Sequence, residues 1–275
     1  MKKRIKVVVT DLDGTLVNND KVLTPYTRKV IETLKSKGVL FAINSGRTLN
    51  VLLNVCRKWN ISDLVDIYIG SNGSEYYETN GYKETSNFLN DKLMLEIYNK
   101  IKDIGSACGV FDDENELLIV DRVNDDSKIV SNNSGYQLKV ENLNEYLIGK
   151  SCSKFFVIDE RNVMLKNKDY LLTLLTDKYT GSYSGGRMFE FVDININKSL
   201  GIKKICELHN IDRDNIMALG DGDNDIDMLT YAGVSVAMGN SHNNVKEKAN
   251  YIALDNNEDG FAKFINNYLE LNIND

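Results

Sequence analysis

Short apolar runs alternate with amphipathic segments in the N-terminal part of the chain. Residues 7–9 form a continuous run of valines, which is typical of a strand buried on both faces of a parallel sheet. Thr24 and Pro25 then offer an N-cap and a first helical residue, and the apolar spacing that follows is helical until Gly38. Further apolar segments predict a strand at 39–44, a helix at 49–59 and a strand at 67–70. This alternation predicts a doubly wound parallel sheet.

The pattern changes near residue 82. Helical spacing recurs over 89–104 and over most of 162–179, while strands are predicted within 110–120, at 155–158 and in a hairpin over 182–193 that turns at Gly185-Gly186. Residues 124–150 are rich in Asn and Ser and support no assignment. Helices interspersed with hairpins indicate an α+β insertion rather than a continued parallel sheet.

The β-α alternation returns in the last third of the chain. It predicts a helix over 198–209, a strand at 216–219, a helix from 225, a strand at 234–237 and a last helix over 260–271. We therefore expect an α/β protein in which one domain, residues 1–82 and 190–275, is interrupted by a second domain, residues 83–189.

The composition limits which partners the protein can bind and indicates its cellular location. The net charge of −7 argues against a nucleic-acid or anionic-membrane surface, although it leaves room for a small phosphorylated molecule. The four cysteines form no Cys-x-x-Cys pair, which favours reduced thiols. Asp11 and Asp13 cut short the apolar run that follows the basic N-terminus, so a signal peptide is not predicted. We expect a cytoplasmic protein, either a monomer or a homodimer.

Two carboxylates follow the first predicted strand directly. Asp11 and Asp13 stand at its carboxyl end, where open α/β sheets bind ligands, and Gly14 allows a backbone conformation that other residues avoid. Two carboxylates so close repel each other unless a cation lies between them. The pair therefore indicates a cation site, and the alternative is a surface turn with a chance Asp-x-Asp spacing.

A second acidic segment, Gly-Asp-Gly-Asp-Asn-Asp at 220–225, lies between a predicted strand and a predicted helix. A calcium loop of the EF-hand type starting at Asp221 would need Gly in place of Ile226 and Glu in place of Ala232. The glycine-rich phosphate loops and the serine-hydrolase elbow are also missing from the sequence. The two histidines, His209 and His242, have no metal-ligand spacing.

Four segments together resemble the motifs of the haloacid dehalogenase-like (HAD) phosphohydrolases. Asp11 to Thr15 resembles the first motif, Ser45-Gly46-Arg47 the second, Lys198 the third and 220–225 the fourth. The layout is similar to the Cof-type branch, whose Rossmann-like core is interrupted by a large type IIB cap. Ser199 stands where the family more often has Gly, and Ser74 where Cof-type proteins more often have Ala.

The resemblance implies a mechanism and a cofactor. Asp11 would be the nucleophile, and Asp13 would be the acid and base, with a pKa raised by burial. One Mg²⁺ would be held by Asp11, the backbone carbonyl of Asp13 and Asp221, with Asp225 supporting Asp221. Ser45 and Lys198 would stabilise the transferring phosphoryl group.

The resemblance also implies residues that contact the substrate. These are Thr15, Gly46, Arg47, Asn72, Gly73, Asn224 and Asn240. Several alternatives stay open at this point. Ser45 can cap the helix that follows it, Arg47 can pair with an acid, and Thr15 can position Asp13 or cap its turn. Lys178 and Lys203 are the alternatives to Lys198, and Glu190, Asn195 and Arg187 can contact the substrate or belong to a hinge or hairpin.

The expected function is a Mg²⁺-dependent phosphatase that acts on small phosphorylated metabolites through an aspartyl-phosphate. A phosphomutase would use the same nucleophile and would require a bisphosphate activator. A sugar-phosphate sensor without turnover is a third possibility, but pure binding has no need of the acid Asp13.

Overall fold

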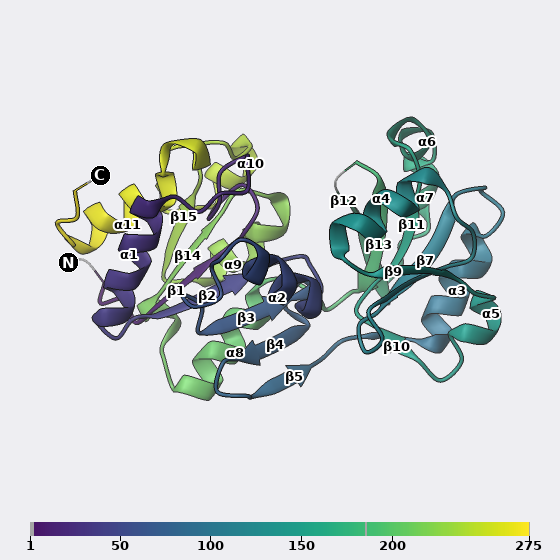
Figure 1. The fold of residues 1–275 in the computed structure, drawn as a ribbon, viewed down its shortest axis with the longest axis horizontal. Helices are drawn as coiled ribbons and strands as arrows, with labels where there is room; N and C mark the ends of the chain where they lie inside the picture. Colours follow the sequence, from purple (N-terminus) through teal and green to yellow (C-terminus); the bar gives the residue numbers. More distant parts are fainter. Residues whose placement is uncertain (1–2, 185, 275) are drawn as a thin grey trace. The chain divides into compact units, whose positions relative to one another are not determined.

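The computed structural model describes residues 3–184 and 186–274 and divides into two compact units (Figure 1). The core unit consists of Met1–Thr85 and Asn197–Asp275, and the inserted unit is Ser86–Ile196. The sequence predicts these boundaries at 82/83 and 189/190. In the structure they lie at 85/86 and 196/197, which is three and seven residues further along the chain.

The core unit is built on an eight-stranded sheet in the order β16-β15-β14-β1-β2-β3-β4-β5. The six strands from β16 to β3 are parallel, and β4 and β5 are antiparallel additions at one edge. The strands are β1 (Val7–Thr10), β2 (Leu40–Asn44), β3 (Ile67–Gly70), β4 (Glu75–Glu78), β5 (Lys83–Thr85), β14 (Ile216–Gly220), β15 (Val234–Ala237) and β16 (Tyr251–Ile252). All four residues of β1 are buried, as its run of valines predicts.

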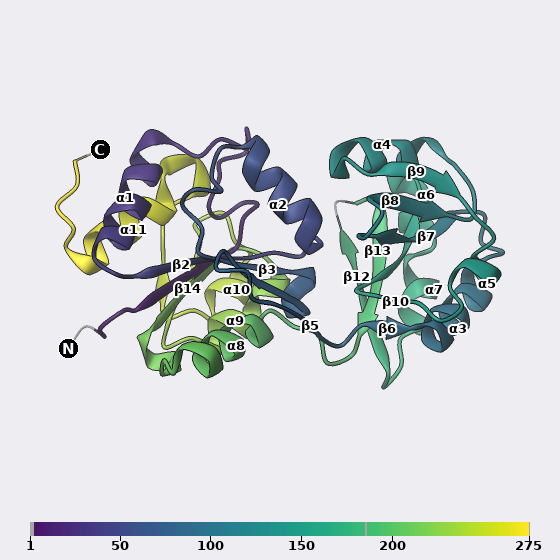
Figure 2. The same cartoon turned by 60° about the horizontal axis from the view of Figure 1, so that its bottom comes forward.

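Helices cover both faces of this sheet (Figure 2). One face carries α1 (Pro25–Ser36), α2 (Leu49–Lys58) and α11 (Gly260–Leu269), and the other carries α8 (Ser199–His209) and α9 (Ile226–Tyr231). Phe41 of β2 meets Phe261 of α11 edge to face on the first side. Val7 and Val9 pack with Ile202 and Met228 on the second side. The core unit is thus a three-layer α/β/α structure, completed by the short helix α10 (Asn243–Lys246).

The inserted unit contains a six-stranded sheet in the order β12-β13-β11-β7-β8-β9 and a two-stranded ladder of β10 and β6. All neighbours in the larger sheet are antiparallel except β8 and β9. The strands are β6 (Leu89–Asn90), β7 (Ala107–Asp112), β8 (Leu117–Val120), β9 (Gln137–Val140), β10 (Ser151–Cys152), β11 (Phe155–Ile158), β12 (Tyr179–Ser184) and β13 (Met188–Asp193).

Five helices accompany these strands in the described part of the unit, residues 86–184 and 186–196. They are α3 (Asp91–Ile101), α4 (Asp125–Ser134), α5 (Leu143–Tyr146), α6 (Arg161–Lys166) and α7 (Lys168–Thr173). Ile97 of α3, Met164 of α6 and Leu171 of α7 pack with Phe155 and Phe189 in one hydrophobic core. The helix expected to reach residue 179 ends at Thr173. The predicted hairpin is formed by β12 and β13, but Gly185 of its turn lies outside the described residues.

The fold class expected from the sequence, a parallel α/β core with an inserted α+β unit, is confirmed. The four cysteines are free thiols. Within residues 3–184 and 186–274, no helix has the length and apolar character needed to cross a membrane.

Candidate active site

The predicted site residues of the core unit follow the carboxyl ends of three neighbouring strands. Asp11 follows β1, Ser45 follows β2 and Asp221 follows β14. Because β1 pairs in parallel with β2 on one side and with β14 on the other, these strands end at the same edge of the sheet. The chain leaves β1 in one direction and returns to its opposite side, which makes this edge a topological switch point, where α/β proteins bind ligands.

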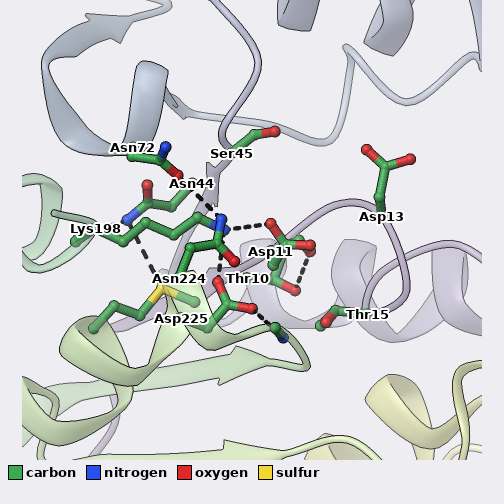
Figure 3. Close-up of polar contacts among 12 residues, drawn as sticks. Thr10, Asp11, Asp13, Thr15, Asn44, Ser45, Asn72, Lys198, Asn224 and Asp225 are labelled. Atoms are coloured by element: carbon green, nitrogen blue, oxygen red, sulfur yellow. Dashed lines mark hydrogen bonds and ion pairs between the residues drawn. The ribbon is translucent and has the colours of Figure 1, made fainter. Parts of the chain in front are cut away.

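Lys198 brings a buried positive charge to this edge from the residue that precedes α8. Its side chain is fully buried, and its Nζ lies 2.5 Å from Asp11 Oδ1 and 2.6 Å from Asp225 Oδ1 (Figure 3). Burial by itself would lower the pKa of Lys198, but the two carboxylates hold it above its ordinary value. The lysine is therefore a permanent ammonium in contact with Asp11. The alternatives considered for it lie elsewhere, since Lys203 stacks over the Tyr231 ring and Lys178 is in the inserted unit.

Asp225 organises the acidic segment rather than presenting a free carboxylate. Its Oδ1 accepts a hydrogen bond from Lys198, and its Oδ2 accepts from the backbone N–H groups of Asp221 and Gly222, each at 2.9 Å. The side chain is buried, so these bonds compensate its desolvation. Both oxygens are already engaged, which leaves Asp225 to hold the loop and the lysine.

The residues present fit a divalent cation. Carboxylate oxygens of Asp11, Asp221 and Asp225 lie within 4.8 Å of one another. With Lys198 as the neighbouring cation, three ionised carboxylates leave two negative charges in excess. Burial raises the pKa of Asp11, as do the charges of Asp225 and Asp221, while Lys198 opposes them. Burial and Asp225 also raise the pKa of Asp221 to about 6. Such carboxylates gain from a hard cation with oxygen ligands. Lys198 contacts Oδ1 of Asp11 and leaves Oδ2 for a cation, and Oδ2 of Asp221 has only a long 3.4 Å contact from Asn240 Nδ2.

Thr15 belongs to this acidic cluster. Its hydroxyl donates to Asp221 Oδ1 at 2.7 Å, so the prediction that it positions Asp13 is wrong. Asn240 reaches the same carboxylate from the loop after β15, with its Nδ2 at 2.9 Å from the Gly14 carbonyl and 3.4 Å from Asp221 Oδ2. Gly14 has a φ of +82°, and a Cβ there would stand 2.5 Å from Asp221 Oδ2. The turn after Asp13 therefore requires glycine for its backbone and for the space beside Asp221.

Asp13 is engaged by two cations and points away from the Asp11–Lys198 pair (Figure 3). Arg47 binds both of its oxygens, at 2.9 Å through Nε and 3.2 Å through Nη2, and Lys21 Nζ lies 2.7 Å from Oδ1. Burial by itself would raise the pKa of Asp13, but the hydrogen bonds and charges of Arg47 and Lys21 outweigh burial and lower it. The expectation of a raised pKa is wrong for this arrangement. Of the two roles considered for Arg47, the structure contains the pairing with an acid.

The loops after β2 and β3 supply neutral groups. Ser45 is buried, and its hydroxyl oxygen accepts from the backbone N–H of Arg47 at 3.2 Å. The helix α2 begins only at Leu49 with Thr48 as its N-cap residue, so Ser45 does not cap it. Asn224 Nδ2 donates to Asn72 Oδ1 at 3.1 Å, which joins two predicted substrate-binding residues.

The two predicted glycines of these loops are tightly packed. A Cβ at Gly46 would lie 3.2 Å from Asn72 Oδ1, and one at Gly73, whose φ is +104°, would lie 2.6 Å from the Asn197 carbonyl oxygen. Thirteen residues were predicted for the site, and all thirteen belong to the core unit. The roles of these residues in binding and catalysis stay predictions.

Three other candidates belong to the inserted unit and have partners there. Glu190 pairs with the buried Lys154 at 3.0 Å. Arg187 forms an ion pair with Asp126, and Asn195 Nδ2 bonds to Asp193 Oδ1 at 2.9 Å.

The sequence interpretation missed two neighbours of the site, Lys21 and Asn44. Nothing in the sequence singles out Lys21, since it reaches Asp13 only because a turn brings residue 21 back beside it. Asn44 carries a weak signal, because it is a polar residue at the end of an otherwise apolar strand.

Comparison with known proteins agrees with this geometry. The family model of the haloacid dehalogenase-like hydrolases matches residues 8–265. The chain is 30% identical over 272 residues to the 5-amino-6-(5-phospho-D-ribitylamino)uracil phosphatase YcsE of Bacillus subtilis, with 96% of each chain covered. It is 26% identical to YitU of the same organism, which is named for the same activity, with 98% of this chain and 100% of YitU covered.

Solved structures share the fold over nearly the whole chain. TM0651 of Thermotoga maritima is 27% identical and superposes with a TM-score of 0.83, covering 96% of this chain and 97% of its own. The subclass IIB sugar phosphatase BT4131 is 21% identical, with a TM-score of 0.80 and coverage of 97% and 99%. Because BT4131 is only 21% identical to this chain, its match is evidence for the fold and not for the function.

The fold and the site together define an α/β protein with an acidic cluster at the topological switch point of its parallel sheet. The chain belongs to the haloacid dehalogenase-like hydrolase family. The family and the enzyme class expected from the sequence are confirmed, and the relatives named phosphatases support a phosphatase activity.

Proposed function

We propose that the protein is a Mg²⁺-dependent phosphatase that hydrolyses small phosphorylated metabolites through an aspartyl-phosphate on Asp11. The observation that carries this proposal is the buried contact of Lys198 Nζ with Asp11 Oδ1 at 2.5 Å. A buried ammonium beside a carboxylate nucleophile offsets the negative charge that a phosphoryl group brings to it. In our proposal, the core unit performs the chemistry and the inserted unit is the cap that sets specificity.

In this proposal, Asp11, the backbone carbonyl of Asp13 and Asp221 would hold the Mg²⁺. When bound, the ion neutralises phosphate charge and aligns the phosphoryl group with Asp11. The raised pKa values of Asp11 and Asp221 support this assignment, because a cation beside them stabilises their ionised forms. Asp225 would act indirectly, through Asp221 and Lys198.

The chemical steps follow from the residues around Asp11. A carboxylate oxygen of Asp11 forms a bond to phosphorus while the bond from phosphorus to the ester oxygen breaks. Asp13 gives its proton to the departing alcohol oxygen. Water then attacks the phosphorus of the aspartyl-phosphate and gives a proton to Asp13, which releases inorganic phosphate and restores the Asp11 carboxylate. Lys198 and Ser45 stabilise the charge on the phosphoryl oxygens throughout.

Asp13 must change its partners to take part. Arg47 and Lys21 hold its carboxylate ionised in the present arrangement, so a proton can be carried only after those contacts loosen. We propose that the substrate phosphate attracts Arg47 and so frees Asp13. Asn72, Asn224 and Asn240 are further polar groups at the same edge, and with Thr15, Gly46 and Gly73 they complete the proposed substrate and metal surroundings.

The first substrate to test is the ester for which two relatives are named. YcsE and YitU are both named for 5-amino-6-(5-phospho-D-ribitylamino)uracil, and each is matched over nearly its full length. We propose this ester as the leading candidate within the class of small phosphomonoesters. We also propose that the enzyme is cytoplasmic.

The test is release of inorganic phosphate from a panel of esters with and without Mg²⁺. The panel contains this ester, hexose phosphates, flavin and nucleotide monophosphates and pyridoxal phosphate. We expect Mg²⁺-dependent release that Asp11→Asn abolishes and that Asp227→Asn, a change of an exposed acid on α9, preserves. Release by Asp11→Asn at the wild-type rate would overturn the mechanism. Turnover that requires a bisphosphate activator would indicate a mutase, and binding without release a sensor.

A further inference from the structure

Asn44 is a buried polar residue at the end of an apolar strand. It follows Leu-Phe-Ala-Ile in β2, and its side chain is fully buried. A buried amide is unfavourable unless its polar atoms form hydrogen bonds, so its contacts indicate why asparagine stands there.

The amide nitrogen of Asn44 contacts two other elements. Nδ2 donates to the backbone carbonyl oxygen of Lys198 at 2.8 Å, and it lies 3.7 Å from the sulfur of Met228 in α9 (Figure 3). The nitrogen rather than the oxygen must face Lys198, because two oxygens at that distance would repel each other. One side chain therefore links the end of β2, the start of α8 and α9.

The other end of the same amide is unsatisfied. Asn44 Oδ1 is buried and has no hydrogen-bond partner in the part of the chain that the structure describes. An unpaired buried acceptor costs stability, and leucine, which has a similar size, would fill the space without that cost. The bond to the Lys198 carbonyl is thus the stronger of two contacts that asparagine makes and leucine cannot, the other being the long one to the Met228 sulfur.

The segment that Asn44 contacts is where the chain re-enters the core unit, which resumes at Asn197. Asn197 Oδ1 accepts from the backbone N–H of Ser199 at 3.1 Å and from its hydroxyl at 2.5 Å. Gly73 packs directly against the Asn197 carbonyl. With Asn44 on its carbonyl and Asp11 and Asp225 on its Nζ, Lys198 is held at both ends.

We propose that Asn44 is a positioning residue for the reaction, which acts by fixing the backbone of Lys198 so that Nζ lies between Asp11 and Asp225. Asn44 touches no reacting atom and works only through Lys198. This inference rests on the proposed function, in which Lys198 stabilises the transferring phosphoryl group. Displacing a catalytic group by as little as about 1 Å can cost about 100-fold in rate, so a backbone anchor has a measurable effect.

The test compares Asn44→Leu with wild type and with Val234→Ala, a buried truncation on β15 that leaves the Lys198 contacts intact. We expect Asn44→Leu to unfold at about the same urea concentration as wild type, because removal of the unpaired acceptor offsets the loss of the bond to the Lys198 carbonyl. We expect its kcat to fall by about 10- to 100-fold. Val234→Ala should show the reverse, with reduced stability and an unchanged kcat. If Asn44→Leu does not fold, Asn44→Ala takes its place.

A second measurement needs no turnover. In protein labelled with ¹³C at the lysine ε carbon, the Lys198 signal is assigned by its loss in Lys198→Arg. We expect Asn44→Leu to move this signal and Val234→Ala to leave it in place. With an active wild-type enzyme, an unchanged kcat in Asn44→Leu overturns the proposal. If wild type releases no phosphate, the proposed function fails and the Lys198 signal decides: a moved signal supports positioning, and an unmoved one overturns it.

Discussion

The hydroxyl of Thr15 lies 2.7 Å from Oδ1 of Asp221, and this contact joins the loop after β1 to the loop after β14. Burial and the charge of Asp225 raise the pKa of Asp221 to about 6, and the Thr15 hydrogen bond opposes them. Thr15 therefore favours the ionised form of Asp221, which is the form that binds a cation.

Replacing Thr15 with valine should weaken Mg²⁺ binding in a pH-dependent way. Without the hydroxyl, the pKa of Asp221 rises further, and protons compete with Mg²⁺ over a wider range of pH. We expect the Mg²⁺ concentration for half-maximal activity to rise several-fold near the Asp221 pKa and less at alkaline pH. Calorimetric titration with Mg²⁺ gives the same comparison without substrate. Thr33→Val on α1 is the control, and an equal change at all pH values would contradict the assignment.

Lys21 should influence the acid–base step through Asp13. Its Nζ lies 2.7 Å from Asp13 Oδ1 and helps to lower the pKa of that carboxyl. Lys21→Met removes this charge, so the pKa of Asp13 rises and its protonated form persists to higher pH. We expect the alkaline limb of the pH profile of kcat to move to higher pH, while exposed Lys29→Met leaves it in place. An alkaline limb that stays fixed in Lys21→Met would contradict this role.

The core unit was predictable because its signals are local. The valines of β1 and the cap of α1 by Thr24 are features of short segments, and each predicted element appears within a few residues of its expected position. The segment 124–150 was not predictable, since α4 has few apolar residues to show a helical spacing. Its capping box pairs Asn124 with Ser127 and lacks the Glu or Gln that usually marks such a start. The short strands β10 and β16 have two residues each and carry no pattern.

The candidate site likewise has a part that the sequence predicts, the residues at one sheet edge, and a part that it does not, the contacts between their side chains. Motif spacing is enough to expect Asp11, Ser45, Lys198 and Asp221 at one sheet edge, because the carboxyl ends of parallel strands meet there. Hydrogen bonds between side chains of different elements depend on the side-chain conformations, and the spacing of residues along the sequence does not predict these. The sequence argument paired Thr15 with Asp13 or with the turn that contains it, and only the fold brings its hydroxyl to Asp221.

Asp225→Asn should destabilise the core unit. The change removes one of the two carboxylates around the buried Lys198 ammonium and leaves a charge that Asp11 alone compensates. Breaking a buried ion pair from one side costs about 3–5 kcal/mol, and the remaining partner favours the lower end of that range. Urea unfolding monitored by circular dichroism measures the loss. Exposed Asp227→Asn should change the free energy of unfolding by less than about 0.5 kcal/mol, and equal losses in both variants would contradict the account.

Glu78 should make stability depend on pH. It accepts hydrogen bonds from Tyr76 and Asn80 at 2.7 and 2.8 Å, and His209 Nε2 lies 2.9 Å away. Burial raises the pKa of Glu78, but the hydrogen bonds outweigh it and hold the pKa below the ordinary 4.5. The ionised form is therefore favoured by folding, so its stabilisation is present above pH 4.5 and is lost as pH falls through the lowered pKa.

The matching experiment is Glu78→Gln across a range of pH. We expect a lower free energy of unfolding than wild type at neutral pH, with the gap closing as the solution is acidified below the ordinary carboxyl range. Glu32→Gln, at a side chain that is 55% exposed, serves as the control and should show little difference at any pH. A gap in Glu78→Gln that widens on acidification would have the wrong sign for this account.

The most direct test of the central claim is a search for phosphate on Asp11 during turnover. Wild-type enzyme with Mg²⁺ and a substrate ester is quenched in acid within the first turnovers, digested, and analysed by mass spectrometry. The account predicts that the peptide containing Asp11 gains the mass of one phosphoryl group, that hydroxylamine removes it, and that Asp11→Asn never acquires it. Phosphate on a different residue, or steady release of phosphate with no phosphorylated peptide at any quench time, would contradict the account.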